Sequence, residues 1–186
     1  MNGGQEPASD GWKRHFLGLA RASIRSALAL PPRPTSPPPT EPMIEARGTF
    51  VTLRVDGHLR GRMGMIKRRT TLSRTIERMA SAAATEDPRF PPLSVDELDS
   101  TRIEISLLGP LSPVEPGAVE VGEDGLVVEG TGRRGLLLPE VAVERGMQRV
   151  EFIEATVKKA GLPADALSRG ATLSRFSTRH FAEGEG

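Results

Sequence analysis

Apolar residues near the start of the chain recur every four positions, which is close to the period of an α-helix. We expect a helix over residues 10–29 that packs this stripe on a core, with Asp10 as its N-cap. His15 lies off the stripe and is expected at the surface. The stripe consists of Trp12, Phe16, Ala20, Ile24 and Leu28.

Proline dominates the next segment, since seven of the 16 prolines fall within residues 31–42. Proline fixes φ and lacks a backbone N–H, so the helix must end before this segment. The composition is typical of an extended linker, which would connect the helix to a main body over residues 47–182. We therefore predict one domain over residues 10–182, with disordered tails at residues 1–9 and 183–186.

A two-residue alternation replaces the helical period further along the chain. The run TFVTLRV over residues 49–55 alternates in this way, as a half-buried strand does. The pair Asp56-Gly57 is typical of a two-residue hairpin turn, and residues 58–66 form the expected return strand. A helix should then begin near Thr70 or Thr71, whose hydroxyl can cap its N-terminus.

The second half of the chain mixes further strands with short helices. A clear alternating strand covers residues 103–107, with Glu104 on the face opposite the isoleucines. Val150 is expected on the apolar side of the last helix. No regular strand–helix–strand spacing connects these elements, so we predict an α+β fold with a mainly antiparallel sheet. The other expected elements are strands over residues 126–129, 135–138 and 173–181 and helices over residues 139–146 and 150–160.

Composition excludes several classes of chemistry. The 186 residues include no cysteine, which rules out disulfides and thiolate chemistry. The three histidines, His15, His58 and His180, have no ligand-type spacing, so we expect no metal and no cofactor. No apolar run approaches the ~18 residues of a membrane helix, and the N-terminus lacks an apolar signal core. A cytoplasmic protein that does not span a membrane is therefore expected.

Basic residues concentrate in one part of an almost neutral chain. The net charge is +1, but residues 54–78 contain eight bases and two acids, which gives +6 for this basic face. Guanidinium groups and exposed backbone N–H groups both donate to oxygen, and a helix N-terminus follows directly. We predict that a small anion or carbonyl-bearing ligand binds here, through Arg60, Gly61, Arg62, Gly64, Lys67, Arg68 and Arg69.

The same residues allow other functions. In a catalytic cleft, His58 and Glu104 would be the candidate proton carriers. In an adaptor, the basic face over residues 54–78 would dock a partner protein. In a further alternative, the arginines are solvated side chains on an ordinary hairpin and bind no ligand. Nucleic acid is disfavoured as a partner, because aromatic residues make up only 4% of the chain and offer few surfaces for base stacking.

Several long motifs, in order, resemble one known family. They are RGTFVTL, HLRGRMG, EDPRFPPL, IEISLLGP, GLLLPEVAVERG and EFIEATVKKAGLP. The chain resembles the AMMECR family, the AMME chromosomal region proteins, over about residues 12–181. In bacteria this family is called system protein A of the AmmeMemoRadiSam set. The resemblance implies one α+β unit with a larger and a smaller lobe, a cleft lined by the HLRGRMG hairpin, and Memo-type and radical SAM proteins as partners.

One position departs from the family pattern. The family motif LRGCIG aligns with residues 59–64, and Arg62 stands where the family has cysteine. A guanidinium group stays protonated and has no lone pair to give. Thiol chemistry at this position is therefore not expected in this protein.

Overall fold

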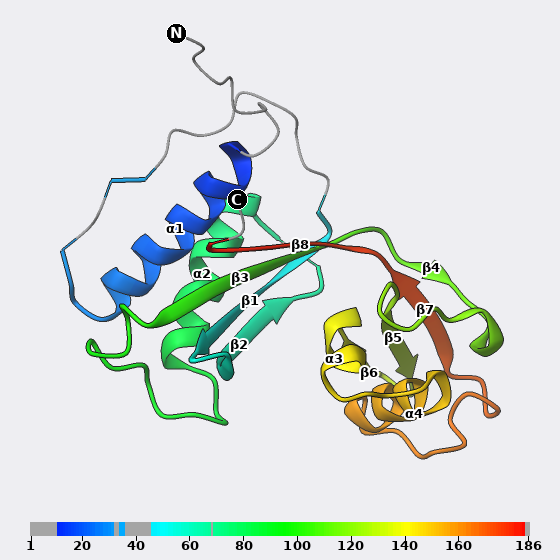
Figure 1. The fold of residues 1–186 in the computed structure, drawn as a ribbon. Helices are drawn as coiled ribbons and strands as arrows, with labels where there is room; N and C mark the ends of the chain where they lie inside the picture. Colours follow the sequence, from blue (N-terminus) through cyan, green and yellow to red (C-terminus); the bar gives the residue numbers. More distant parts are fainter. Residues whose placement is uncertain (1–10, 32–33, 36–45, 68, 185–186) are drawn as a thin grey trace, which may run out of the picture. The chain divides into compact units, whose positions relative to one another are not determined.

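The structure is a computed structural model that describes residues 11–31, 34–35, 46–67 and 69–184 (Figure 1). The predicted linker over residues 31–42 therefore lies largely outside the described residues, and the site candidate Arg68 lies wholly outside them. The elements are α1 (Gly11–Ala27), β1 (Gly48–Val55), β2 (His58–Met65), α2 (Leu72–Thr85), β3 (Thr101–Leu108), β4 (Ser112–Pro113), η1 (Pro116–Ala118), β5 (Gly125–Gly130), β6 (Arg133–Leu137), α3 (Pro139–Glu144), α4 (Arg149–Lys159), β7 (Thr172–Phe176) and β8 (Thr178–Ala182).

The chain divides into two compact units. The first runs to Leu107 and resumes at His180, and the second covers residues 108–179. Each unit contains one four-stranded sheet, with strand orders β2-β1-β3-β8 and β4-β7-β5-β6. The predicted α+β class with antiparallel strand pairing is confirmed. In the described part of the chain, no helix is both long and apolar enough to cross a membrane.

In the first unit, α1 and α2 pack on one side of the sheet (Figure 1). The predicted stripe of α1 is confirmed, since Phe16, Ala20 and Ile24 are buried in the core that it shares with α2 and the sheet. The surface position expected for His15 is wrong, because this side chain is only 6% exposed and its ring lies 5.4 Å from that of Phe16. A helix that packs against both a sheet and another helix buries more than a four-residue stripe.

The first hairpin follows the predicted pattern. Strands β1 and β2 pair antiparallel from Val55 and His58 outward, and Asp56 and Gly57 take the positive φ angles that a tight hairpin turn requires. Thr71 caps α2 by accepting a hydrogen bond from the backbone N–H of Arg74. This turn and this cap determine where the HLRGRMG motif and the bases after it lie.

The second unit is built from the predicted hairpin of β5 and β6 and the helix α4, which packs on these strands. The turn is shorter than expected and consists of Thr131 and Gly132, both at positive φ. Val150 is 64% exposed, so its predicted place in the core is wrong. It lies in the first turn of α4, where the buried face is formed by Phe152, Ile153, Thr156 and Val157.

The single strand predicted over residues 173–181 is also wrong. The structure has two strands there, β7 and β8, which belong to different sheets. Ser177 separates them and accepts a backbone hydrogen bond from Gly109. After β8, Glu183 is held by the side chain of Arg21 and by hydrogen bonds to the backbone of Ile103. Glu183, the first residue of the predicted tail, is therefore attached to α1 and β3.

Candidate functional site

One face of the first sheet carries a group of polar side chains. Side chains alternate between the two faces of a strand, and Val51, Leu53, Ile103, Ile105 and Phe181 all point into the core on the side of the helices. Their neighbours therefore lie on the opposite face. We call the following group the polar face: Thr52, Arg54, Arg62, Glu104, Ser106 and His180.

Hydrogen bonds connect these side chains across strands. Arg62 Nε donates to Thr52 Oγ1 at 2.9 Å, and Arg54 Nε donates to Glu104 Oε1 at 3.0 Å. Ser106 Oγ lies 3.2 Å from His180 Nδ1. Thr52, Glu104 and Ser106 are buried, although all three are polar. Two guanidinium groups, two hydroxyl groups and an imidazole thus share one face with the carboxylate of Glu104, which pairs with Arg54. The guanidinium, hydroxyl and imidazole groups can donate hydrogen bonds to an anionic ligand.

The two candidate proton carriers are not brought together. Glu104 forms an ion pair with Arg54 and lies 4.0 Å from the guanidinium group of Arg102. His58 is exposed at the hairpin, where it pairs with Val55. Within the described residues, no hydrogen bond or ion pair joins His58 to Glu104, so the structure offers no proton relay between them.

Arg60 attaches the loop after α2 to the hairpin. Its guanidinium group binds both carboxylate oxygens of Glu97, at 2.7 and 3.0 Å. It also donates to the carbonyl oxygens of Pro91 and Pro92, at 2.9 and 3.2 Å. Hydrogen bonds from Arg60, and then from the backbone N–H of Ser94, lower the pKa of Glu97 to about 2. These bonds fix a rigid proline-rich loop, because a forked guanidinium group holds its partners in one geometry.

Asp87 makes a second attachment between the same loop and β2. Its carboxylate accepts a hydrogen bond from the backbone N–H of Arg62 at 2.8 Å and two from the guanidinium group of Arg89, at 2.6 and 2.9 Å. The pKa of Asp87 is lowered to about 2, mainly by the hydrogen bonds from the Arg89 side chain. Phe90 lies between two guanidinium groups, 5.5 Å from that of Arg89 and 6.0 Å from that of Arg60.

Both glycines of the motif serve close packing. A Cβ atom on Gly61 would lie 2.1 Å from the carbonyl oxygen of Ala83 in α2. A Cβ atom on Gly64 would lie 2.2 Å from the ring of Phe50. The first glycine lets a helix approach the strand, and the second leaves room for an aromatic ring on the polar side of the sheet.

The bases after β2 are placed differently from Arg60. Lys67 and Arg69 are exposed just before α2, and no side-chain partner for either is found among the described residues. Elsewhere in the basic face, ion pairs join arginines to acids further along the chain. These pairs are Arg54–Glu104, Arg60–Glu97 and Arg78–Glu86. The pairing offsets much of the local excess of positive charge that the sequence shows.

Replacing Arg60 by lysine should loosen the loop although the charge is kept. Lysine cannot reproduce two parallel bonds to Glu97 together with bonds to two carbonyl oxygens, so we expect a loss of about 1 to 2 kcal/mol of unfolding free energy. Urea unfolding measures this loss. Arg78→Lys is the matched control, because Arg78 also binds a glutamate with two bonds but does so in solvent. Equal stability of the two variants would contradict a clamping role for Arg60.

Sequence reasoning missed the pairing of Ser106 with His180 and the pairing of Asp87 with Arg89. Ser106 was visible only as one polar position in an alternating strand, and His180 lies 74 residues away. The capping box of Ser94 and Glu97 is detectable from its spacing and is present in the structure. The pairing of Glu97 with Arg60 cannot be detected from sequence spacing in this way. Among the described residues, no group of three or more histidine or acidic side chains is arranged to hold a metal ion.

Comparison with known proteins gives consistent matches. A family model described as AMMECR1 matches residues 17–181. A protein of Methanothermobacter thermautotrophicus is 43% identical over 147 residues, which are 75% of this chain and 77% of that relative. A protein of Thermococcus gammatolerans is 37% identical over 190 residues, which are 94% of this chain and 91% of that relative. The crystal structure of the uncharacterized protein PH0010 from Pyrococcus horikoshii superposes with a TM-score of 0.83 at 35% identity and covers 93% of this chain and 92% of that one.

Proposed function

We propose a function for this chain, which belongs to the AMMECR1 family, from its own geometry, because the names of the relatives reported above state no activity. The chain is a binding module that holds a small anion or an acidic group on the polar face. The observation that carries this proposal is the gathering of Arg62, Thr52, Ser106 and His180 on one side of the sheet. The proposed ligand is an oxyanion or carboxylate, since these groups accept the hydrogen bonds that such side chains donate.

In this proposal the residues of the motif divide into two roles. Arg62 contacts the ligand, while Arg60, Gly61 and Gly64 hold the strand, helix and loop around it. Lys67, Arg68 and Arg69 contribute positive charge from the segment before α2, whose unpaired N–H groups favour an anion. His58 and Glu104 have no proposed catalytic role, because Glu104 is ion-paired and His58 is not joined to it.

Titration with sulfate, phosphate and acetate, followed through backbone amide shifts, tests this function. We expect saturable shifts in β1 and β2 near Thr52 and Arg62. Arg62→Ala should weaken binding about tenfold or more, because a charged contact is removed while the backbone bond to Asp87 is kept. Lys67→Ala with Arg69→Ala should weaken it less, and by an amount that shrinks as salt is added.

Arg169→Ala is the control for bulk charge, since Arg169 pairs with Asp165 in the second unit. Small, uniform shifts over the whole surface, or binding that Arg62→Ala leaves unchanged, would refute the proposed site. Loss of binding only in the Lys67 and Arg69 variant would place the anion at the helix N-terminus instead.

The alternative function is an adaptor that does not need a free ligand. The specific observation in its favour is the loop over residues 87–93, which Arg60 and Asp87 hold rigid while Pro91 and Pro92 remain exposed. A preformed loop of this kind loses little entropy on binding. The resemblance to the family suggests Memo-type and radical SAM proteins as partners. Binding of such a protein that persists in Arg62→Ala would favour the adaptor over the anion site.

A further inference from the structure

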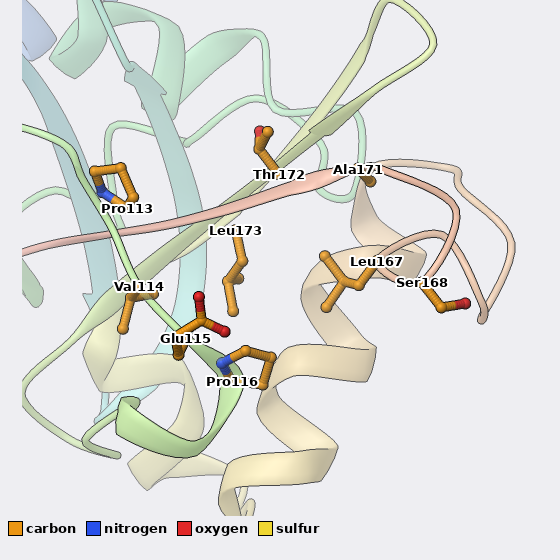
Figure 2. A pocket seen from close by; sticks show the side chains of 9 residues that line it. All are labelled: Pro113, Val114, Glu115, Pro116, Leu167, Ser168, Ala171, Thr172 and Leu173. Atoms are coloured by element: carbon orange, nitrogen blue, oxygen red, sulfur yellow. The ribbon is translucent and has the colours of Figure 1, made fainter.

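The second unit contains a pocket that the proposed function does not use. It lies beside β4 and β7, has a volume of about 550 Å³ and falls within the range of small-molecule sites (Figure 2). Strand β4 is only two residues long, and the chain then turns away through η1 and leaves the space open. The apolar walls come from Pro113, Val114, Pro116, Leu167 and Leu173.

Among the residues that the structure describes, one charged side chain, that of Glu115, lines this pocket. Figure 2 shows the carboxylate of Glu115 directed toward the side chains of Leu167 and Leu173. Within the described residues, no basic side chain pairs with Glu115. The two arginines nearest in sequence to the lining segments have other partners, because Arg169 binds Asp165 at 3.5 Å and Arg175 binds Asp124 at 3.6 Å.

The surrounding segment increases the negative potential. Residues 103–132 contain no lysine and no arginine. Within them, residues 115–129 supply five carboxylates, Glu115, Glu120, Glu123, Asp124 and Glu129. Arg175 pairs with Asp124 and Arg134 pairs with Glu129, so Glu115, Glu120 and Glu123 supply the negative charge that favours a cation over an anion.

We propose that this pocket binds a primary ammonium group on an apolar stem, as in the lysine side chain of a partner peptide. The ammonium group would donate to Glu115, and the methylene groups would lie against the proline and leucine walls, in the way that lysine stems cover apolar surface. The proposal is independent of the anion site, because all lining residues belong to the second unit.

The test compares three small probes on the full chain by backbone amide shifts. n-Pentylamine carries the charge and the stem, 1-pentanol carries the stem alone, and Nα-acetyl-lysine N-methylamide presents the group as a peptide does. We expect both ammonium probes to shift residues 113–116 and 167–173 saturably, and pentanol to bind at least fivefold more weakly. Tighter binding of the lysine derivative than of pentylamine would identify a peptide as the source of the ligand, and the reverse order would identify a free amine.

Two variants separate a charge effect from a loss of structure. Glu115→Gln keeps the shape of the side chain and should weaken pentylamine about five- to tenfold, because one partly exposed charge contact is lost. Glu123→Gln removes an exposed charge of the same acidic segment that does not line the pocket and should weaken it less than twofold. Equal binding of pentylamine and pentanol, or equal effects of the two variants, would overturn the proposal.

Discussion

Gly61→Ala is expected to destabilise the protein by about 3 kcal/mol, which is a large fraction of the stability of a typical domain. The new Cβ atom would lie 2.1 Å from the carbonyl oxygen of Ala83 and 3.1 Å from its carbonyl carbon. Both atoms belong to the backbone of α2, so no side-chain rotation relieves the clash. The helix must move away from β2, and the core contacts of Ile76 and Ala80 loosen with it.

Denaturant unfolding monitored by circular dichroism measures this loss. Gly117→Ala is the matched control, because a Cβ atom there meets nothing within 4 Å and Gly117 does not require positive φ. The control should change the unfolding free energy by less than about 0.5 kcal/mol. A Gly61 variant as stable as this control would show that the helix and strand are not packed as closely as the structure indicates.

The position of this glycine illustrates what periodicity predicts well. The alternation over residues 49–55 and the turn at Asp56-Gly57 predict which side of β1 faces the core and where the hairpin reverses, since both signals are local. They do not predict the face of Arg62, because a regular ladder from this turn would pair Arg62 with Val51, whereas the register shift between Leu53 and Arg54 pairs it with Thr52 on the polar face. The predicted cap at Thr71 and the hairpin of β5 and β6 follow in the same way from neighbouring residues.

The contacts of the candidate site could not be predicted, because they join residues far apart in the chain. Arg60 meets Glu97 across 37 residues, and a periodic pattern contains no information about such a pairing. The sequence indicated an arginine available to a ligand, whereas the structure shows one that fastens a loop. The burial of His15 is not predictable from the helical period either, because His15 lies outside the four-residue stripe.

The break at Ser177 had no local signal either. Residues 172–182 contain no glycine or proline that would break one long strand, but the two halves pair in separate sheets. The chain passes from the second unit back to the first after Arg179, within β8. The division of the chain into two units therefore depends on pairing between distant strands and not on composition.

Asp87→Asn is expected to remove about 2 to 3 kcal/mol of stability at neutral pH and to flatten the stability profile in acid. The carboxylate is buried and accepts hydrogen bonds from Arg62 and Arg89, which lower its pKa from 3.8 to about 2. A lowered folded-state pKa stabilises the protein fully above the unfolded value. That contribution, about 2 kcal/mol, is lost as pH falls from about 4 to about 2.

Unfolding free energies at pH 7, 4 and 2.5 distinguish this effect from general acid denaturation. The difference between the natural protein and Asp87→Asn should be largest at pH 7 and should shrink as pH falls, since protonation removes the same charge that the substitution removes. Glu86→Gln is the control, because the carboxylate of Glu86, which is next to Asp87 in the sequence, pairs with Arg78 in solvent. This substitution should alter the stability profile little. A difference that stays constant from pH 7 to pH 2.5 would contradict a contribution from the charge of Asp87, because asparagine keeps the shape of the side chain and protonation removes the charge.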